Sequence, residues 1–423
     1  MKPLKYLFIL ILVSCTFIPN VPDEVIEPDE VIEIPLENIQ EEVVLTFYDP
    51  VETMNPNTEL KPIFDGQTRT NGIKTTSSYT TSILTDQLIN PWAIDILPDS
   101  MFIVTERNGN FVIISEDGTI YNRIPLNTDI DDSGQGGLLD VLVSTDFNIS
   151  HILYITLAEK TSLGSLTAVA KVVLSNNLTS IDAFTIIYRA YPYFSGSNHY
   201  GSRIVFDRDG NLFVSTGDRQ ALETRPNAQS LNNGHGKILH ITTDGLSVES
   251  NPFIDNKDVH KEIFSIGHRN IQGLAIHPLT QALWANEMGP QGGDELNLIE
   301  SGKNYGWPVI SYGEEYSGFP IGDGISEKEG LEQPIYYWDP VIAPSGMIFY
   351  NSNVIPEWEN NLFISGLKSQ FITRLHIDNN IVIGEERLLE NENQRFRDIT
   401  VGIDGALYTI TDAGQTLSNR KIT

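Results

Sequence analysis

A two-strand unit recurs six times after about residue 79, and this repeat constrains the fold more than any other feature of the sequence. In each copy a small or polar residue opens an alternating apolar strand, a turn follows, and a second strand rises to a polar loop. The copies begin about 45 to 75 residues apart, as propeller blades do, and no long helical periodicity interrupts them. They cover residues 90–106, 136–156, 201–216, 273–286, 344–365 and 397–410.

The repeat therefore predicts an all-β fold, a six-bladed β-propeller formed by residues 76–423. Each unit can bury its sheet faces only against its neighbours, and closure of the ring protects the terminal units. The extra length between the third, fourth and fifth copies is expected to form loops on one face. Two stacked β-sandwich domains are the alternative, but no interdomain linker supports them.

The first residues have the order of a bacterial lipoprotein signal. Lys2 and Lys5 flank the start of an apolar run, and Leu-Val-Ser-Cys places the chain's only cysteine, Cys15, directly after it. We expect a signal peptide at residues 1–14, lipidation of Cys15, and a protein anchored to a membrane of the bacterial envelope on its periplasmic side. An ordinary signal peptide or a short anchor that contains a cysteine is the alternative.

Residues 15–75 are expected to form an acidic, flexible tether. Acid, proline and Val/Ile alternate in this stretch, and no Lys or Arg occurs between Lys5 and Lys61. Charge repulsion and proline favour an extended chain, although a helix or an added edge strand is an alternative.

The composition excludes several classes of function. The formal net charge of −29 and the lack of a basic stripe argue against nucleic acid as a partner. A single cysteine excludes a disulfide framework and a CxxCH haem site.

His199 and Asp218 lie at almost equal distances from the Asp209-Gly210 turn of the third copy. The hairpin should bring both side chains to the same end, within cross-strand reach. A carboxylate beside an imidazole fixes its tautomer and strengthens it as a base. The pair is a candidate catalytic site, and a structural His–Asp hydrogen bond is the alternative.

In the fourth copy Arg269-Asn270 and Gly289-Pro290 are about equally far from the turn at 277–278. Such positions meet at one end of an antiparallel hairpin. Cationic donors suit an anionic ligand, whereas carbonyl oxygens suit a hard cation such as calcium. An anionic cofactor bridged by a metal ion would use both, and a loop with solvated charges is the alternative.

Further polar residues are expected at the same end of the other copies, and with Arg269 they include four cations. Such a cluster in an acidic protein favours a multiply anionic ligand, although each residue alone could be a solvated rim charge. These residues are Gln135, Lys368, Arg395 and Arg397.

Asp294 and Glu295, together with Tyr305, are candidate ligands of a second, structural cation. A salt bridge is the alternative for the two carboxylates. The sequence Tyr305-Gly306-Trp307-Pro308 is expected to pack a loop, and its aromatic rings could also line the opening of the ring.

Nine sequence motifs, in order over about residues 80 to 415, resemble the soluble pyrroloquinoline quinone (PQQ)-dependent glucose/sorbosone dehydrogenases, and most closely their aldose sugar dehydrogenase branch. The motifs are NPWAIDILPD, GQGGLLD, HYGSRIVFDRDGNLFVSTGDR, GHGKILHI, IGHRNIQGLAIHP, EMGPQGGDELNLI, GKNYGWP, APSGMIFY and RFRDITVGIDGALY.

The resemblance implies a six-bladed propeller with the quinone across its mouth. His199 would be the general base, Asp218 the carboxylate that orients it, and Arg269 the cation beside the reactive quinone carbonyl. The carbonyls of Gly289 and Pro290 would bind the calcium ion that joins the cofactor to the protein. The residues that match cofactor-binding positions are Gln135, Asn270, Lys368, Arg395 and Arg397.

Three positions depart from the family pattern. Val341 stands near the position of a threonine that often contacts the cofactor. Trp338 and Asp339 both compete for the place of a covering aromatic residue, and Asp140 replaces a glycine. These departures bear on substrate preference and cofactor affinity.

The sequence thus predicts oxidation of aldose sugars at C1 to lactones, with PQQ and Ca²⁺ as cofactors. One alternative is a calcium-dependent propeller lactonase, which would need a metal ion ringed by carboxylates and amides in the central channel. The other is a non-catalytic propeller that binds glycans or proteins.

Overall fold

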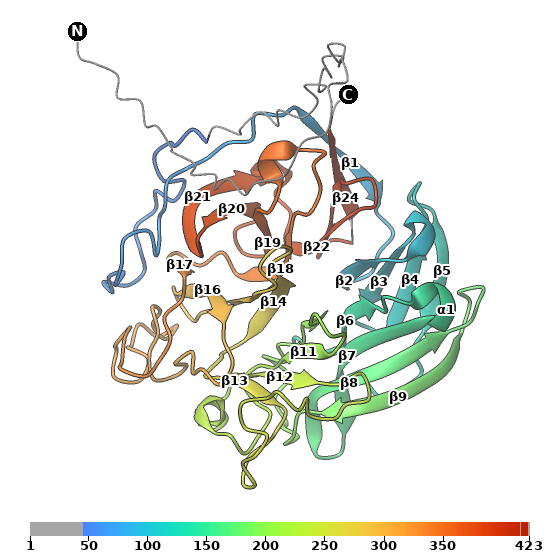
Figure 1. The fold of residues 1–423 in the computed structure, drawn as a ribbon, viewed down its shortest axis with the longest axis horizontal. Helices are drawn as coiled ribbons and strands as arrows, with labels where there is room; N and C mark the ends of the chain where they lie inside the picture. The colour runs from blue at the N-terminus through green and yellow to red at the C-terminus, as the bar shows by residue number, and fades with distance from the viewer. Residues whose placement is uncertain (1–44, 415, 422–423) are drawn as a thin grey trace, which may run out of the picture. The chain divides into compact units, whose positions relative to one another are not determined.

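The computed structural model describes residues 45–414 and 416–421, all within one compact unit, Val43–Thr423. These residues form six four-stranded antiparallel sheets arranged around a common centre (Figure 1). The predicted all-β propeller is confirmed. Among the described residues the helices are short: α1 (Phe147–Ser150) and the 3-10 turns Pro98–Ser100, Arg225–Gln229, Pro356–Trp358 and Glu390–Glu392.

The strands follow one another in chain order within five of the sheets. The first sheet holds β2 (Pro91–Ile96), β3 (Phe102–Glu106), β4 (Asn110–Ile114) and β5 (Ile120–Pro125). The second holds β6 (Leu138–Val143), β7 (Ile152–Thr161), β8 (Gly164–Leu174) and β9 (Ile181–Arg189). The third holds β10 (Ile204–Phe206), β11 (Leu212–Ser215), β12 (Lys237–Ile241) and β13 (Ile263–Ile266).

The fourth sheet holds β14 (Ile271–Ile276), β15 (Leu283–Glu287), β16 (Asp294–Ile299) and β17 (Tyr336–Trp338). The fifth holds β18 (Pro344–Phe349), β19 (Leu362–Gly366), β20 (Ile372–Asp378) and β21 (Ile381–Leu388). The sixth joins the two ends of the described chain: β22 (Phe396–Val401), β23 (Leu407–Thr411) and β24 (Thr416–Lys421) are completed by β1 (Tyr79–Thr85), which pairs antiparallel with β24.

In five sheets, the strand that comes first in the chain lies innermost in the ring. In the sixth sheet the innermost strand is β22, and β1 lies at the opposite edge. Contacts between neighbouring inner strands form a closed cycle, β2–β6–β10–β14–β18–β22–β2. Register shifts occur near the start of five of these strands, at Pro91/Ala93, Leu138/Val141, Ile271/Gly273, Pro344/Met347 and Phe396/Asp398. An extra residue in a strand twists it and re-aims the following side chain. Residues at the starts of all six inner strands line one cavity, and we call this end of the ring the mouth.

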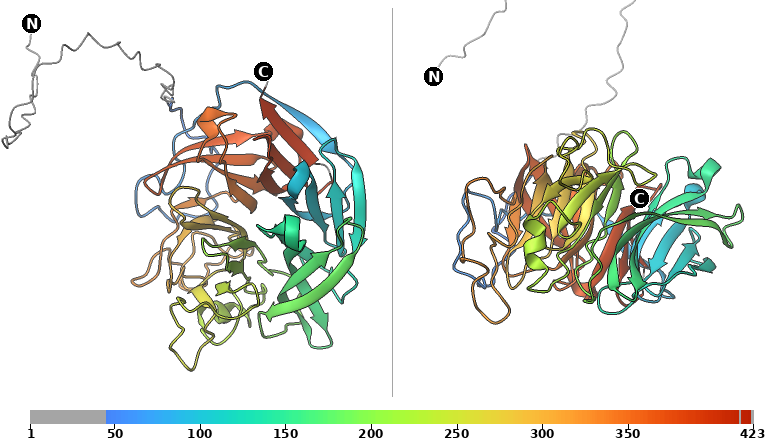
Figure 2. Two further views of the ribbon diagram at one scale, coloured as in Figure 1. Left: turned by 45° about the vertical axis from the view of Figure 1, so that its right-hand side comes forward. Right: turned by 90° about the horizontal axis from the view of Figure 1, so that it is seen from below.

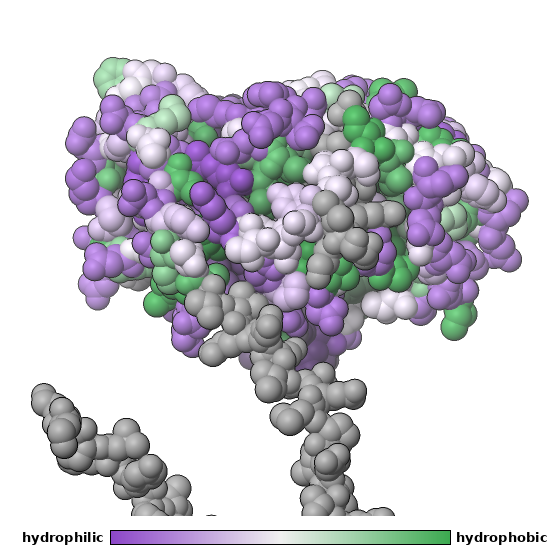
Figure 3. Space-filling model, turned by 90° about the horizontal axis from the view of Figure 1, so that it is seen from above, coloured by the Kyte–Doolittle hydropathy of each residue, from purple (hydrophilic) through white to green (hydrophobic). Residues whose placement is uncertain are grey.

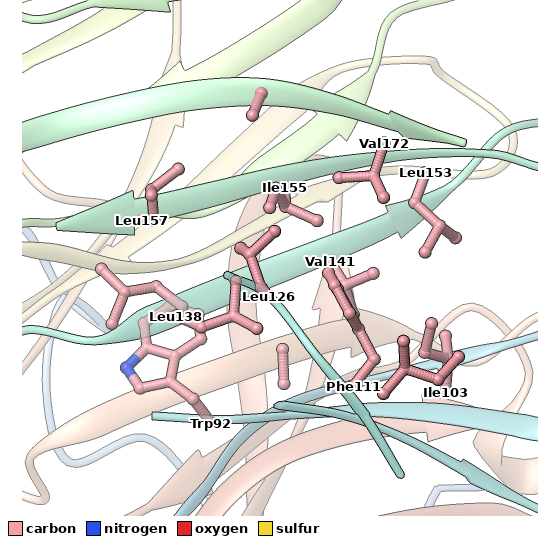
Figure 4. Packing of buried hydrophobic residues seen from close by; sticks show 14 of the residues in the cluster. Trp92, Ile103, Phe111, Leu126, Leu138, Val141, Leu153, Ile155, Leu157 and Val172 are labelled. Atoms are coloured by element: carbon pink, nitrogen blue, oxygen red, sulfur yellow. The ribbon is translucent and has the colours of Figure 1, made fainter. Parts of the chain in front are cut away.

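Apolar side chains pack between adjacent sheets. Between the first two sheets, Ile103 and Phe111 face Leu153 and Ile155, and all four are fully buried (Figure 4). Burial of each such side chain stabilises the fold by about 1.5–3 kcal/mol. On the face seen in Figure 3, hydrophilic and hydrophobic residues are interspersed. The apolar residues of the repeat thus pack neighbouring sheets against each other and stabilise the ring.

The expected flexible tether over residues 15–75 is wrong for its described part, residues 45–75. We call residues 52–77 the belt, because they run along the outer edges of the fourth and fifth sheets (Figure 2). Asn57 and Thr58 donate four hydrogen bonds of 2.7–3.1 Å to the carboxylate of Asp339. Gln67 donates to the carbonyl of Pro334, just before β17, and Thr70 donates to the carbonyl of Val382 in β21. Polar side chains thus find buried partners that an acidic composition did not reveal.

The predicted signal peptide, Cys15 and the remainder of the tether lie outside the described residues. No helix within residues 45–414 and 416–421 is both long and apolar enough to cross a membrane.

Candidate active site

His199 and Asp218 meet at the mouth, as the symmetry about their turn predicted. His199 precedes β10 and Asp218 follows β11, and His199 Nδ1 lies 2.6 Å from Asp218 Oδ1. Both side chains are buried, with 4% and 1% of their surface exposed. His199 has a φ of 47°, in the left-handed region that non-glycine residues seldom adopt. Such backbone conformations gather at functional sites.

The electrostatics of the pair favour a neutral imidazole beside an ionised carboxylate. Burial lowers the pKa of His199, and the nearby Arg269 charge lowers it further. Burial alone would raise the pKa of Asp218, but its hydrogen bond with His199, the nearby Arg269 charge and the hydrogen bond from the Gln220 N–H outweigh burial and lower it. The ionised Asp218 therefore accepts the Nδ1 proton, which leaves the Nε2 lone pair as the basic site.

A cavity of about 330 Å³ is lined by Tyr200 and Gly201, which directly follow His199, although neither His199 nor Asp218 is among its lining residues. It is lined by residues at the starts of all six inner strands, including four of the predicted ones, Gln135, Asn270, Arg395 and Arg397. Sequence reasoning missed the other lining residues, of which the larger ones include Trp92, Arg107, Tyr200, Gln272, Met288 and Asp412.

Hydrogen bonds tie Gln135, Arg269 and Asn270 to the backbone around the His199–Asp218 pair. Gln135 Oε1 accepts the backbone N–H of His199 at 2.8 Å. The carbonyl of Arg269 accepts the N–H of Asp218 at 2.8 Å, and Asn270 Oδ1 accepts the N–H of Gly201 at 3.1 Å. These two hydrogen bonds join the third copy to the fourth at the mouth.

Two of the four predicted cations, Arg395 and Arg397, line the cavity, together with Arg107. Arg395 and Arg397 both donate to Asp412, at 2.9 and 3.0 Å, so the three groups together carry one net positive charge. The side chain of Lys368 is exposed and does not line the cavity, although its neighbour Leu367 does. Arg269 donates through Nη1 to the carbonyl of Met288 at 2.8 Å, while its buried Nε has no hydrogen-bond partner among the described residues.

A smaller cavity adjoins Arg269 on the other side of Met288. Gly289, Pro290, Glu287, Glu295, Tyr305 and Ser311 are among its lining residues. Desolvation, followed by the Glu287 charge, raises the pKa of Glu295 well above its usual range. A site with two crowded carboxylates and carbonyl-bearing loop residues has the chemistry of a calcium site.

Two members of the predicted second cation site take other roles. Asp294 does not line this cavity, because its two oxygens accept the N–H groups of Gly289 and Ala343, each at 2.7 Å. The hydroxyl of Tyr305 donates to the carbonyl of Leu298 at 2.6 Å, which leaves the backbone carbonyl of Tyr305 as its candidate ligand. In the described part of the chain no three His, Cys, Asp or Glu side chains are grouped closely enough to hold a metal ion by themselves.

Comparison with known proteins shows the family to which the chain belongs. The family model for glucose/sorbosone dehydrogenases matches residues 88–418. The chain belongs to the glucose/sorbosone dehydrogenase family. It is 39% identical over 333 residues to the aldose sugar dehydrogenase YliI of Escherichia coli, covering 78% of this chain and 89% of that protein. It is 25% identical over 415 residues to the quinoprotein glucose dehydrogenase B of Acinetobacter calcoaceticus, covering 79% and 86%.

Solved structures in the glucose/sorbosone dehydrogenase family share the fold. The apo form of the soluble aldose sugar dehydrogenase from E. coli superposes with a TM-score of 0.77 at 38% identity, over 82% of this chain and all of that one. The family match begins at residue 88, so the belt at residues 52–77 precedes it.

The structure also accounts for Asp140, a departure from the family pattern. Arg203 Nη1 lies 2.9 Å from Asp140 and 3.0 Å from Asp398, and its Nε donates to the carbonyl of Gln272 at 2.7 Å. The guanidinium also lies over the ring of Trp92, 4.2 Å from its centroid. Arg203 and its two carboxylates therefore occupy the centre of the ring beneath the cavity, where the alternative lactonase would need its metal ion.

Neither candidate for the covering aromatic residue lines the cavity. Trp338 is buried in β17, and Asp339 is bound by the belt. Ala343, rather than Val341, contributes to the cavity wall. Sequence alignment alone could not decide which of residues 338–343 faces the cavity. Residues 339–343 connect β17 to β18, and a loop does not have the regular alternation of a strand.

Proposed function

We propose that this protein is a PQQ-dependent aldose sugar dehydrogenase that oxidises the C1 hydroxyl of aldoses to lactones and passes the electrons to an external acceptor. The observation that carries the proposal is the His199–Asp218 pair beside a cavity lined by Gln135, Asn270, Arg395 and Arg397. The family assignment and the sugar dehydrogenases among the relatives support it.

The cavity fits a multiply anionic quinone. Arg395 and Arg397 supply charge-assisted donors, and the amides of Gln135 and Asn270 supply neutral ones. Arg269 lines the adjoining smaller cavity, and its buried Nε has no partner among the described residues, so it is a further donor that favours a bound acceptor. When bound, PQQ would accept the hydride removed from C1. Lys368 would act only at the rim, since its side chain is exposed.

His199 would take the hydroxyl proton through Nε2. Asp218 holds Nδ1–H, so the imidazole is oriented and becomes a stabilised imidazolium when it gains the proton. Arg269 would stabilise negative charge that develops beside it. Loss of the C1 hydrogen as hydride and of the hydroxyl hydrogen as a proton converts the cyclic sugar to its lactone.

Calcium would be held at two places. The carbonyls of Gly289 and Pro290 would bind the ion that joins the cofactor to the protein, where a divalent cation supplies Lewis-acid polarisation. Glu295 and the carbonyl of Tyr305 would bind a second, structural ion in the small cavity.

We further propose that the six sheets are six blades, and that the protein is exported and lipid-anchored through Cys15, with residues 1–14 removed. Support comes from the closed cycle of inner strands and from the order of charged, apolar and small residues before Cys15. Labelling of cells with a radioactive fatty acid tests the anchor: the wild-type chain should be labelled, and Cys15→Ser should not.

Reconstitution tests the catalytic proposal. The purified apoprotein should oxidise sugars with an artificial dye as acceptor only after addition of PQQ and calcium, and His199→Ala should abolish the activity. A panel of aldoses then identifies the preferred sugar. If the reconstituted protein binds no quinone, the proposal is wrong.

A further inference from the structure

Trp307 completes the set of donors around Asp218. Its indole Nε1–H donates to Asp218 Oδ2 at 2.8 Å. The other oxygen, Oδ1, is 2.6 Å from His199 Nδ1 and accepts the N–H of Gln220 at 2.7 Å. Asp218 is 1% exposed, so each of these donors replaces water that the carboxylate has lost.

Trp307 reaches this position from a different sheet. It lies in the loop between β16 and β17, whereas His199 and Asp218 flank strands of the third sheet. The backbone of Trp307 is fixed at both polar groups: its N–H donates to Gly267 at 2.9 Å, and its carbonyl accepts from Gln229 Nε2 at 2.7 Å. The indole is therefore held by the protein before any ligand binds.

Two guanidinium groups also approach the indole ring. The Cζ atoms of Arg269 and Arg225 lie 5.2 and 5.0 Å from the ring centroid, and Arg225 is ion-paired with Glu315. Cations at this distance are attracted by the ring electrons. One side chain thus contacts both Arg269 and the carboxylate that orients His199.

We propose that Trp307 is a positioning residue for the dehydrogenase reaction, acting on His199 through Asp218; this inference rests on the proposed function. Donation from the indole withdraws electron density from the carboxylate and fixes its plane. The carboxylate then orients the imidazole, and its weaker basicity keeps the His199–Asp218 pair from binding a second proton.

Removal of the indole N–H has a defined electrostatic consequence. With one donor fewer, Asp218 becomes a stronger acceptor, and the His199–Asp218 pair takes up its additional proton at a higher pH. The pair must lose this proton before it can act as a base. In a plot of kcat against pH, the rise on the acidic side, which we call the acid limb, should therefore move to higher pH in a variant without the N–H.

Trp307→Phe in the full chain tests the inference, because Phe keeps an aromatic ring and lacks the N–H. After reconstitution with PQQ and calcium, kcat should fall roughly 10-fold, near the lower end of the effect of removing an outer hydrogen-bond partner from a functional histidine. KM for the sugar should change less than about twofold, and the acid limb should rise by about one pH unit.

Trp284→Phe is the matched control. Trp284 is fully buried in β15, and its Nε1 has no hydrogen-bond partner among the described residues, so the same replacement removes an indole N–H far from the pair. It should lower thermal stability and leave the acid limb at the wild-type pH. An acid limb that is the same in Trp307→Phe and the wild type would overturn the inference.

A second measurement needs no cofactor. Histidine labelled with ¹⁵N in the apoprotein reports the tautomer and the titration of His199, whose signals are assigned by their loss in His199→Gln. The titration midpoint should rise in Trp307→Phe, and an unchanged midpoint would refute the positioning role. The two proposals can therefore fail separately. If the reconstituted wild-type protein oxidises no sugar, the proposed function is wrong, while the difference in the His199 titration midpoint between wild type and Trp307→Phe still tests the effect of Trp307 on the pair.

Discussion

Arg203 Nη1 lies 2.9 Å from Asp140 Oδ1 at the centre of the ring, and the same nitrogen lies 3.0 Å from Asp398. Because one guanidinium compensates two carboxylates, burial still raises the pKa of both Asp140 and Asp398. The inner strands β6, β10 and β22 are joined by this charge network below the cavity. The network fixes the floor on which the ligand would rest.

Replacement of Arg203 by Met should lower the free energy of unfolding by about 3–5 kcal/mol, because two buried carboxylates lose their cation. Urea denaturation at pH 7 measures the change. Arg208→Met removes an exposed guanidinium at the turn after β10 and should change stability by less than about 0.5 kcal/mol. Equal effects of the two substitutions would contradict a structural role for Arg203.

His199→Gln and Asp218→Asn should each lower kcat of the reconstituted enzyme by about 10² to 10⁴-fold, because the general base is lost or misoriented. The base must be neutral to act, and burial lowers the pKa of His199 below its usual 6.5. Wild-type kcat should therefore rise as pH increases and reach half its maximum below pH 6.5.

His240→Gln is the control for the histidine variants. His240 Nε2 also pairs with a carboxylate, Asp207, at 2.8 Å, but near the turn end of the β10–β11 hairpin, away from the mouth. This variant should keep kcat within about twofold of the wild type while losing stability. A large fall in kcat would show that the mouth is not the reacting end.

The alternation of apolar residues was sufficient to predict the propeller, and turn symmetry was sufficient to pair His199 with Asp218. Both are local features, since a hairpin fixes which residues face each other. Arg395 and Arg397 were found for the same reason, because they open an inner strand. Their partner Asp412 was missed, although it follows β23 of the same hairpin.

Other contacts that sequence reasoning missed join segments that are far apart along the chain. Asp339 and its belt partners Asn57 and Thr58 are separated by 282 and 281 positions, and Trp307 and Asp218 by 89. No periodicity marks such contacts, because they depend on how loops cross from one sheet to the next. The acidic composition of the N-terminal region also suggested a tether beyond residue 45, where polar side chains instead bind the propeller.

The double variant Asn57→Ala/Thr58→Val should lower the free energy of unfolding by about 2–4 kcal/mol, because Asp339 loses two side-chain donors and charged hydrogen bonds are the stronger kind. Thermal denaturation measures the loss. Asn55→Ala is the control, since Asn55 is exposed in the same segment. Limited proteolysis should cut the belt faster in the double variant, and an unchanged cleavage rate would argue that the belt is held by other contacts.

Arg397→Gln should raise the dissociation constant for PQQ by roughly 10 to 100-fold, because a cavity-lining donor loses its charge. Quenching of tryptophan fluorescence on titration with PQQ measures affinity without turnover. Lys368→Gln should change the constant less than threefold at about 0.15 M salt, because an exposed charge is screened. The opposite ranking would restore Lys368 to the binding site.

The pH dependence of stability should reveal the carboxylates beside the proposed calcium sites. Burial raises the pKa of Asp294 to about 7, and desolvation with the Glu287 charge raises that of Glu295. A raised acid pKa means that the folded state holds the proton more tightly than the unfolded state. This stabilisation is complete below about pH 4 and is lost as pH rises toward the folded pKa.

Calcium-free protein should therefore lose stability between about pH 4 and 7, and calcium should restore it at pH 7.5 by binding the ionised Glu295. Thermal denaturation with EDTA or with 1 mM calcium, about the concentration that fills extracellular sites, measures both effects. Glu295→Gln should reduce the calcium response, whereas Glu300→Gln, at an exposed position, should not. A full calcium response in Glu295→Gln would remove Glu295 from the ligand set.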